Sequence, residues 1–170
     1  MKQIFSTLII MGLLLVLSYS CNKDEEATGT DKELLNLVEE KIQWVYFKNS
    51  TNYLTKSVGS GHNFSLLKTR YNALAASQLD ANGKIISNAK FPEGSLIVKD
   101  LTNTTHHVER YAILYKQSTH KDADAKGWVW GYINTDGTVA TSASDKGSIC
   151  IGCHSQSDNI DYMLMNKFFP

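Results

Sequence analysis

The chain has 170 residues, the size of one domain with short appendages. Its 17 basic and 17 acidic residues give a formal net charge of zero. The sequence therefore lacks the surplus of positive charge that nucleic-acid-binding proteins carry, and we expect no nucleic acid among its partners.

Residues 1–20 have the pattern of a lipoprotein-type signal peptide. Lys2 supplies the positive charge, and the apolar run over residues 8–17 is too short to span a membrane comfortably. Leu17-Ser18-Tyr19-Ser20-Cys21 resembles a bacterial lipobox, although Ser18 stands where leucine is commonest. We therefore expect a lipidated Cys21 and an exported chain, anchored to a bacterial membrane on its periplasmic or cell-surface side. Ordinary secretion with Cys21 free is the alternative.

Residues 21–30 are polar and predict a flexible tether, which leaves residues 31–170 as a single folded domain. A helix is expected at the start of this domain. Thr30 and Glu33 have the spacing of a capping box. Apolar residues recur at helical spacing at Leu34, Val38, Ile42 and Val45.

The next part of the chain has a less regular pattern. Residues 48–61 are rich in Ser, Thr, Asn and Gly and predict a loop. Residues 65–71 are expected to form a strand and residues 73–79 a short helix. Asn82-Gly83 predicts a turn.

From residue 91 onward the hydrophobic period is two, which is typical of strands. The turn residues Phe91-Pro92-Glu93-Gly94 lead into a predicted strand over residues 95–101, and further strands are predicted over residues 109–116 and 127–133. Asp136-Gly137 then predicts a hairpin turn. Two sets of side chains are each expected to share one face of their strand: Tyr111, Ile113 and Tyr115, and Trp128, Trp130 and Tyr132.

Cys150-Ile151-Gly152-Cys153-His154, before a last predicted helix over residues 159–167, has the spacing of a c-type haem attachment site. Each thiol adds to one vinyl group of the haem, and the two-residue gap sets the distance between the sulfurs. His154 then lies beneath the ring as a ligand of the iron. Because the motif occurs once, we expect one covalent haem c per chain. Bacteria attach this haem outside the cytoplasm, which agrees with the predicted export.

Three other uses of the two cysteines compete with haem attachment. A disulfide between Cys150 and Cys153 needs no histidine beside it, and CxxC pairs are redox motifs more often than structural links. A thioredoxin-like site belongs beside an early βαβ unit, whereas these cysteines come near the end of the chain. A structural zinc site needs four ligands, and beyond His154 only distant histidines remain. All three rank below haem attachment.

The sequence offers no obvious second iron ligand. Met163 and Met165 follow His154 too closely to reach the opposite side of the ring, and both are expected in the core of the last helix. Each of the other histidines could be a sixth iron ligand, but all four lie in polar stretches and are expected to be solvated instead: His62, His106, His107 and His120. We therefore expect an open distal iron site. Asp100 and Glu109 are candidate proton acceptors there, or else surface carboxylates.

Three segments resemble the cytochrome P-460 and cytochrome c′-β family. They are Phe91-Pro92-Glu93-Gly94-Ser95-Leu96-Ile97-Val98-Lys99-Asp100, Gly127-Trp128-Val129-Trp130-Gly131-Tyr132, and the CxxCH motif followed by Asp161-Tyr162. The resemblance covers about residues 62–168, and its most specific part is the Phe-Pro-acid-Gly turn that enters a strand with an inner lysine. Met163-Leu164-Met165 departs from the family, which tends to have a valine and a phenylalanine there.

The resemblance implies an α+β fold, in which an antiparallel β-sheet with flanking helices is followed by the CxxCH segment and a short helix. It also implies a homodimer, with His154 as the proximal ligand of one haem c and an open iron site. Such a site binds or oxidises small nitrogen species such as hydroxylamine or nitric oxide, and electrons pass to a periplasmic acceptor. Class I cytochrome c is mostly helical and has its motif near the start of the chain, so the late motif and the period-two strands distinguish this chain from it. The four-helix cytochrome c′ also has a late motif, and the period-two strands exclude that fold.

Lys99 falls on the position where the P-460 branch bonds a lysine to the porphyrin edge and oxidises hydroxylamine, so the resemblance makes it a candidate catalytic residue. The c′-β branch instead has a phenylalanine-lined pocket that binds nitric oxide without turnover. By strand alternation Lys99 shares a face with Ile97 and Leu101, where a lysine is costly unless it is paired, reaches solvent or is used. Whether the protein is an enzyme depends on Lys99. An electron-transfer cytochrome c is the third alternative.

Overall fold

The computed structural model describes residues 25–105 and 107–170. The predicted signal peptide, the predicted lipidation site Cys21 and His106 lie outside the described residues. Within the described part of the chain, no helix is both long enough and apolar enough to cross a membrane.

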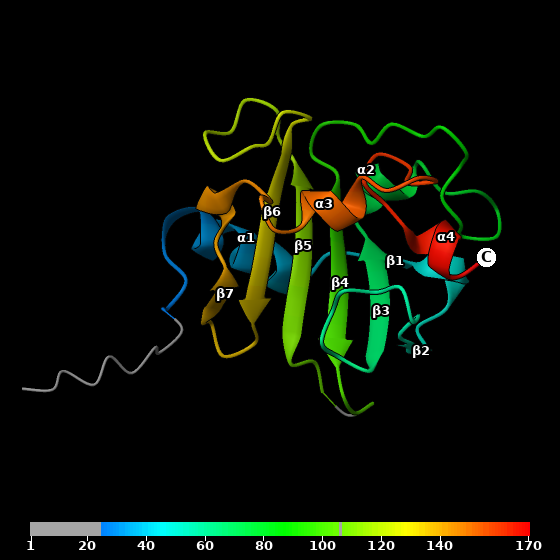
Figure 1. Ribbon diagram of the computed structural model, residues 1–170, viewed down its shortest axis with the longest axis horizontal. Coiled ribbons are helices and arrows are strands. Elements are labelled where there is room, and N and C mark those ends of the chain that lie inside the picture. The colour runs from blue at the N-terminus through cyan, green and yellow to red at the C-terminus, as the bar shows by residue number, and fades with distance from the viewer. Residues whose placement is uncertain (1–24, 106) are drawn as a thin grey trace, which may run out of the picture.

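One antiparallel sheet forms the centre of the molecule (Figure 1). Its strands are β1 (Val45–Tyr46), β2 (Leu54–Thr55), β3 (Leu66–Tyr71), β4 (Leu96–Thr102), β5 (Arg110–Lys116), β6 (Trp128–Asn134) and β7 (Val139–Thr141). The order is β1-β3-β4-β5-β6-β7, and β2 pairs with β3 on the same edge as β1. Sequential strands thus lie side by side from β3 to β7. The four predicted strands, β3 to β6, are confirmed to within one residue at each end.

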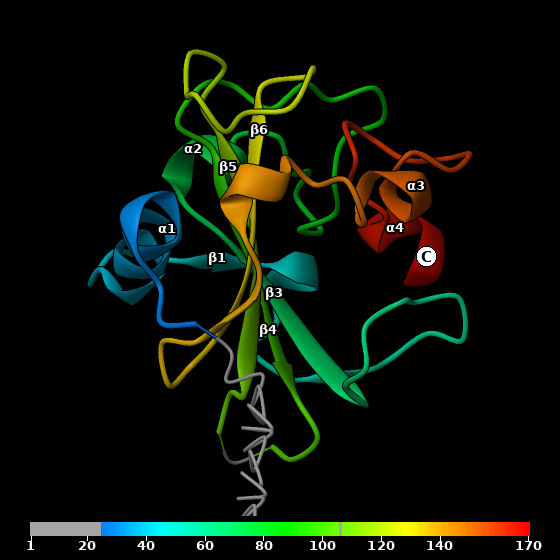
Figure 2. The same cartoon turned by 60° about the vertical axis from the view of Figure 1, so that its left-hand side comes forward.

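The two faces of the sheet carry separate hydrophobic layers, because successive side chains on a strand alternate between faces. Helix α1 (Gly29–Glu39) covers one face, and the C-terminal segment with α3 (Ile151–His154) and α4 (Met165–Phe168) covers the other (Figure 2). Both predicted strand faces are confirmed. The side chains packed toward α1 include Tyr111, Ile113 and Tyr115, and those packed toward the C-terminal segment include Trp128, Trp130 and Tyr132.

Helix α1 buries one apolar stripe against the sheet, formed by Leu34, Leu35 and Val38. The predicted capping box is wrong. Thr28 is the N-cap residue, and the Thr30 hydroxyl donates to Asp122 Oδ2 at 2.6 Å instead of capping the helix. The helix ends at Glu39, before the predicted apolar position Ile42, which is exposed.

Part of the predicted tether is folded. Glu26 forms a β-bridge with Thr138 beside β7, and the Ala27 backbone N–H donates to the Gly137 carbonyl at 2.8 Å. The predicted tether over residues 21–30 therefore overlaps the fold from residue 25 onward. The polar composition of this segment did not indicate that it is folded, because backbone hydrogen bonds can form with almost any side chain.

Two segments between β1 and β4 differ modestly from the prediction. Helix α2 (Ala73–Ala76) is shorter than the predicted helix over residues 73–79, and it begins where the Asn72 side chain accepts a hydrogen bond from the Ala75 N–H at 2.9 Å. The predicted loop over residues 48–61 contains β2 and part of a 3₁₀ turn, Phe47–Asn49.

The predicted last helix over residues 159–167 is wrong, since only the short α4 is helical near this place. Asp161 and Tyr162 have φ angles of 48° and 72°, in the left-handed region that interrupts a helix. The Asp161 carboxylate accepts hydrogen bonds from the Phe91 N–H at 3.1 Å and from Trp128 Nε1 at 3.3 Å. These tertiary bonds override the local helical pattern.

Candidate functional site

A cavity of about 310 Å³ lies between the sheet and the C-terminal segment. Its floor is built from side chains of neighbouring strands. Lys99 on β4 pairs with Ala112 on β5, and Ala112 pairs with Tyr132 on β6, so these three residues form one row across the sheet. The other walls come from the loop between β2 and β3, from the CxxCH segment and from the start of α4 with the two residues before it. They include His62, Ile149, Cys150, Cys153, His154, Met163, Leu164 and Met165.

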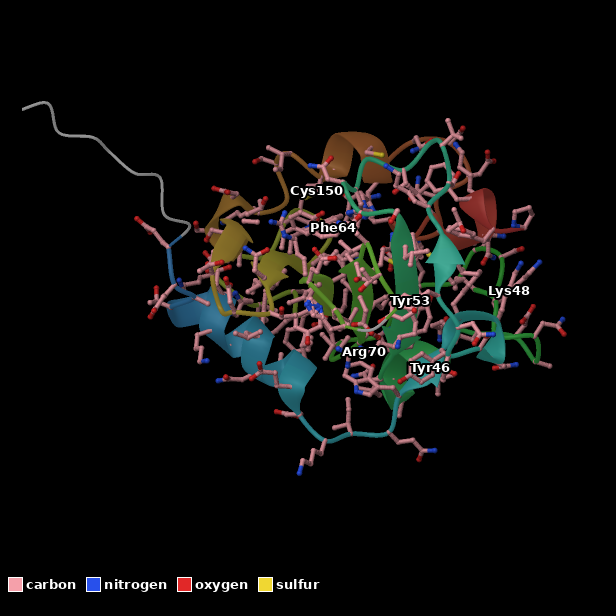
Figure 3. The ribbon with its side chains drawn as sticks, turned by 90° about the horizontal axis from the view of Figure 1, so that it is seen from below. Tyr46, Lys48, Tyr53, Phe64, Arg70 and Cys150 are labelled. Carbon is pink, nitrogen blue, oxygen red and sulfur yellow. The ribbon has the colours of Figure 1, made fainter. Side chains whose placement is uncertain are left out.

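The two cysteines of the CxxCH motif line this cavity, Cys150 as the N-cap residue of α3 and Cys153 from within it. The His154 N–H donates to the Cys150 carbonyl at 3.0 Å, and this single helical turn brings residues three apart onto the same side. Both thiols are free, with Cys150 half-buried and Cys153 exposed. Burial raises the pKa of the Cys150 thiol. Figure 3 shows Cys150 on the same side of the sheet as Phe64, from the loop between β2 and β3.

His154 is held in one orientation and one tautomer. Its Nδ1 lies 2.7 Å from the Tyr162 carbonyl oxygen, which only accepts, so Nδ1 carries the hydrogen and Nε2 keeps a free lone pair. The Trp130 ring and the imidazole pack in a T-shaped arrangement, with ring centroids 5.2 Å apart. Burial, and secondly the charge of Lys99, lower the pKa of His154 to about 4, so the imidazole is neutral at pH 7. A neutral imidazole with a fixed tautomer is the form that binds a metal.

Lys99 projects from β4 into the cavity, on the face predicted by strand alternation. Ile97 and Leu101, its neighbours on that face, belong to the same hydrophobic layer. Burial lowers the pKa of the Lys99 amine to about 8. Its Nζ lies 3.3 Å from His62 Nε2.

His62 does not lie in solvent as the polar sequence around it suggested; it lines the cavity. Its ring centroid is 6.5 Å from that of His154, and its Nδ1 lies 3.4 Å from the Tyr132 hydroxyl. Burial, followed by the charges of Lys99 and His154, lowers the pKa of His62 to about 2. No periodic pattern marks a loop residue, and only the closure of the loop onto the sheet brings His62 to this place.

The two other histidines that the structure describes, His107 and His120, do not line the cavity. His107 is exposed, as expected. His120 is largely buried, contrary to expectation: its Nε2 lies 3.6 Å from Glu33 of α1, and its Nδ1 accepts from the Asp122 N–H at 3.1 Å. It therefore belongs to the contact with α1.

The two candidate proton acceptors also lie outside the cavity lining. Asp100 accepts from Arg70 Nε at 3.0 Å, and Lys68 Nζ lies 3.9 Å from it. Because it follows Lys99 directly on β4, it points to the opposite face of the sheet. Glu109 accepts from the Asn103 N–H in the turn between β4 and β5. Both carboxylates thus have structural partners outside the cavity lining.

Met163 and Met165 are core residues, as predicted, although Met163 lies outside any helix. Both also line the cavity. The Met165 sulfur accepts a hydrogen bond from the Thr69 hydroxyl at 3.3 Å. This bond turns the sulfur toward β3.

The chemistry of the lining fits the haem that the CxxCH motif predicts. Two free thiols lie on one turn, a neutral imidazole offers Nε2, and the remaining walls are largely apolar, with Ile97, Leu114 and Trp130 among them. A large flat apolar group is favoured in such a cavity because its burial removes apolar surface from water.

A family model described as Cytochrome P460 matches residues 44–165, which is more than half of the chain. The matched range includes all seven strands and the CxxCH segment, whereas α1 precedes it. Comparison with curated proteins and comparison with solved structures each gave no match.

Proposed function

Because the chain belongs to the cytochrome P460 family, we propose that it is an exported c-type cytochrome with one covalent haem, which binds or oxidises small nitrogen species such as hydroxylamine or nitric oxide at an open iron site. The family implies the haem cofactor. The observation that best supports the proposal is that Cys150, Cys153 and His154 all line one apolar cavity, into which Lys99 also projects.

In this proposal Cys150 and Cys153 would hold the haem through thioether bonds, and His154 would bind its iron through Nε2. The bound haem supplies an iron that takes up a small ligand and exchanges electrons. The Tyr162 carbonyl keeps Nε2 unprotonated and prevents the imidazole from rotating, while the Trp130 ring packs against the imidazole. The apolar walls exclude water from the reacting ligand.

Contacts of two of the other candidate ligands, His62 and Met165, support an iron site without a second protein ligand. Both ring nitrogens of His62 have partners, at 3.3 Å to Lys99 Nζ and at 3.4 Å to the Tyr132 hydroxyl. The Met165 sulfur is likewise engaged by Thr69. These bonds disfavour a second protein ligand and therefore disfavour the alternative of a simple electron-transfer cytochrome.

The attachment is tested by replacing both cysteines, Cys150→Ala with Cys153→Ala, in cells that mature c-type cytochromes. Acidified acetone should extract the haem from this double variant but leave it on the wild-type chain, because only the thioether bonds survive acid. A Ser155→Ala variant, next to the motif but without a thiol, is the control and should retain its haem. Haem that stays on the double variant after extraction would refute the attachment.

Whether Lys99 bonds to the haem distinguishes an enzyme that oxidises hydroxylamine from a protein that only binds nitric oxide. Only a neutral amine attacks a ring carbon, and a pKa of about 8 leaves roughly a tenth of the Lys99 amines neutral at pH 7, against about 0.04% for an ordinary lysine. Joining the amine to the porphyrin edge replaces one N–H and one C–H bond by a C–N bond. It releases two protons and two electrons, which a two-electron oxidant of the peroxide class would accept. We propose that this bond forms and that the protein is a hydroxylamine-oxidising oxidoreductase.

Peptide mass spectrometry after trypsin digestion tests this bond. The Lys99 peptide and the peptide with residues 150–154 should be recovered joined through one haem. In a Lys99→Met variant, which keeps a long side chain but has no amine, the haem should remain on the cysteine peptide alone. A free Lys99 peptide from the wild-type chain would favour nitric oxide binding without turnover.

A further inference from the structure

We propose that His62 is a positioning residue that holds the Lys99 amine for its bond to the haem edge. This inference rests on the proposed Lys99 bond and adds a residue that the sequence patterns did not single out. His62 comes from the loop between β2 and β3, which lies on the same side of the sheet as α3 (Figure 2).

The row of side chains on the cavity floor explains how one imidazole reaches both of its partners. Lys99 and Tyr132 stand on β4 and β6, about 10 Å apart across two strand spacings. Ala112 on β5 lies between them and carries only a methyl group. The His62 ring bridges its two neighbours there, with Nε2 at 3.3 Å from Lys99 Nζ and Nδ1 at 3.4 Å from the Tyr132 hydroxyl.

Tyr132, the partner of His62 Nδ1, is itself held in place on the sheet. The His62 and Tyr132 rings lie 5.7 Å apart and are tilted by 33°. The Arg110 guanidinium carbon lies 4.7 Å from the Tyr132 ring centroid and 5.4 Å from that of Phe64, in the same loop as His62. Tyr132 is thus held by a neighbouring strand and in turn holds His62.

The backbone of His62 is also held in place. Lys56 Nζ donates to the His62 carbonyl at 3.0 Å, which closes the loop on itself. The imidazole is therefore anchored at its main chain and at Nδ1, and Nε2 is the end that meets Lys99. Such an anchored group is suited to orient a neighbour.

The contact of His62 with the Lys99 amine matters because the lysine side chain has four methylene carbons and many rotamers. An amine that is held near the haem edge does not have to reach the reactive rotamer by chance. The rate of bond formation is therefore higher. The walls beside Lys99 are largely apolar, with Ile97, Leu114 and Trp130 among them. Loss of His62 would free the amine to turn away from the haem edge.

The test measures the fraction of Lys99 peptide joined to the haem peptide in the full haem-loaded chain. We expect His62→Ala to lower this fraction at least about tenfold, because the amine loses its orientation. His62→Gln, whose amide can bond the amine, should restore part of it, and Tyr132→Phe, which removes only the hydroxyl behind His62, should give an intermediate loss. His107→Ala, a change of an exposed histidine far from the cavity, should match the wild type.

Haem content per chain and the melting temperature of each variant show that the fold and the thioether bonds remain. An equally joined Lys99 peptide in His62→Ala, or in both His62→Gln and Tyr132→Phe where the alanine variant does not fold, would overturn the inference but leave the Lys99 bond standing. A free Lys99 peptide already in the wild type would overturn both. A low-spin iron that becomes high-spin in His62→Ala, with the joined fraction unchanged, would make His62 an iron ligand instead and would also overturn it.

Discussion

At the scale of single residues, the position of His154 depends on the Trp130 ring. Trp130 meets the His154 imidazole edge-on and also packs against Tyr162, whose carbonyl accepts from His154. Gly147 lies behind Trp130: a Cβ at this position would come within 2.7 Å of the indole ring. The φ of Gly147 is +70°, which side chains other than glycine rarely adopt.

We expect Gly147→Ala to lower the free energy of unfolding by about 2–4 kcal/mol, because backbone strain and an overpacked indole add together. Urea denaturation measures the loss. Gly137→Ala is the matched control, since Gly137 has a φ of +88° but nothing within 4 Å of its Cβ position. This control should lose only about 1 kcal/mol. Equal losses in the two variants would show that the contact with Trp130 does not matter.

The sequence predicted one of the two central cavity residues and missed the other, for a physical reason. Lys99 lies on a strand, where alternation with period two determines which face a side chain takes. His62 lies in a loop, and its place depends on the bond from Lys56 and on contact with Tyr132, which is 70 residues away. The arrangement of the CxxCH residues could be predicted from the sequence because they lie within a single turn. The role of the Tyr162 carbonyl in orienting His154 could not be predicted, since any residue can supply a carbonyl.

At the scale of the elements, α1 is attached to the sheet by polar as well as apolar contacts. The Asp31 carboxylate accepts from the Ser142 hydroxyl and from the Ala143 N–H, both at 2.7 Å, and is itself largely buried. Ala143 is fully buried, so this bond satisfies an N–H that water cannot reach. The helix is thus tied to the segment that leads from β7 toward α3.

Replacing Asp31 by alanine should therefore cost about 1–3 kcal/mol of unfolding free energy, because the Ala143 N–H is left without a partner. Chemical denaturation followed by tryptophan fluorescence checks the value. Glu33→Ala on the same helix removes a carboxylate that is half-exposed and 3.6 Å from His120, and should cost less than about 1 kcal/mol. A loss in Asp31→Ala no larger than that of Glu33→Ala would contradict the proposed tie.

Strands were easier to predict than helices in this chain. Tyr111, Ile113 and Tyr115 repeat with a period of two and pack on one face, so their local pattern and their tertiary environment agree. Near the C-terminus the two disagree. The Asp161 carboxylate bonds to Phe91 and Trp128, far away in the chain, and the left-handed backbone that accompanies these bonds replaces the expected helix.

At the scale of the whole molecule, we propose export, a lipid anchor at Cys21, a periplasmic electron acceptor and a homodimer. Several acyl chains on Cys21 would hold the domain stably, at roughly 0.8 kcal/mol per buried CH₂. The fold begins by residue 25, where Glu25 already accepts from the Val139 N–H at 2.8 Å. An anchored domain would therefore stand close to the membrane surface.

Cys21→Ser should move the protein from the membrane fraction to the soluble fraction of cells, because the acyl chains can no longer be attached. Immunoblots of the separated fractions measure the change. Ser20→Ala, which keeps a small residue before the cysteine, should leave the wild-type distribution intact. An unchanged distribution in Cys21→Ser would mean that Ser18 prevents this segment from functioning as a lipobox and that this cysteine is not acylated.

The position of residues 25–27 along β7 also affects how neighbouring membrane-anchored chains can associate. The backbone groups of an edge strand are ready to pair with another chain, and a lipid anchor raises the local concentration of such edges. Here β7 has three residues and is bridged by Glu26, while β1 and β2 at the other edge have two residues each. Within the residues that the structure describes, neither edge offers a long unpaired strand, and this disfavours aggregation of crowded copies by strand addition. A homodimer of this protein is accordingly expected to form through side-chain surfaces, with the two sheets remaining separate.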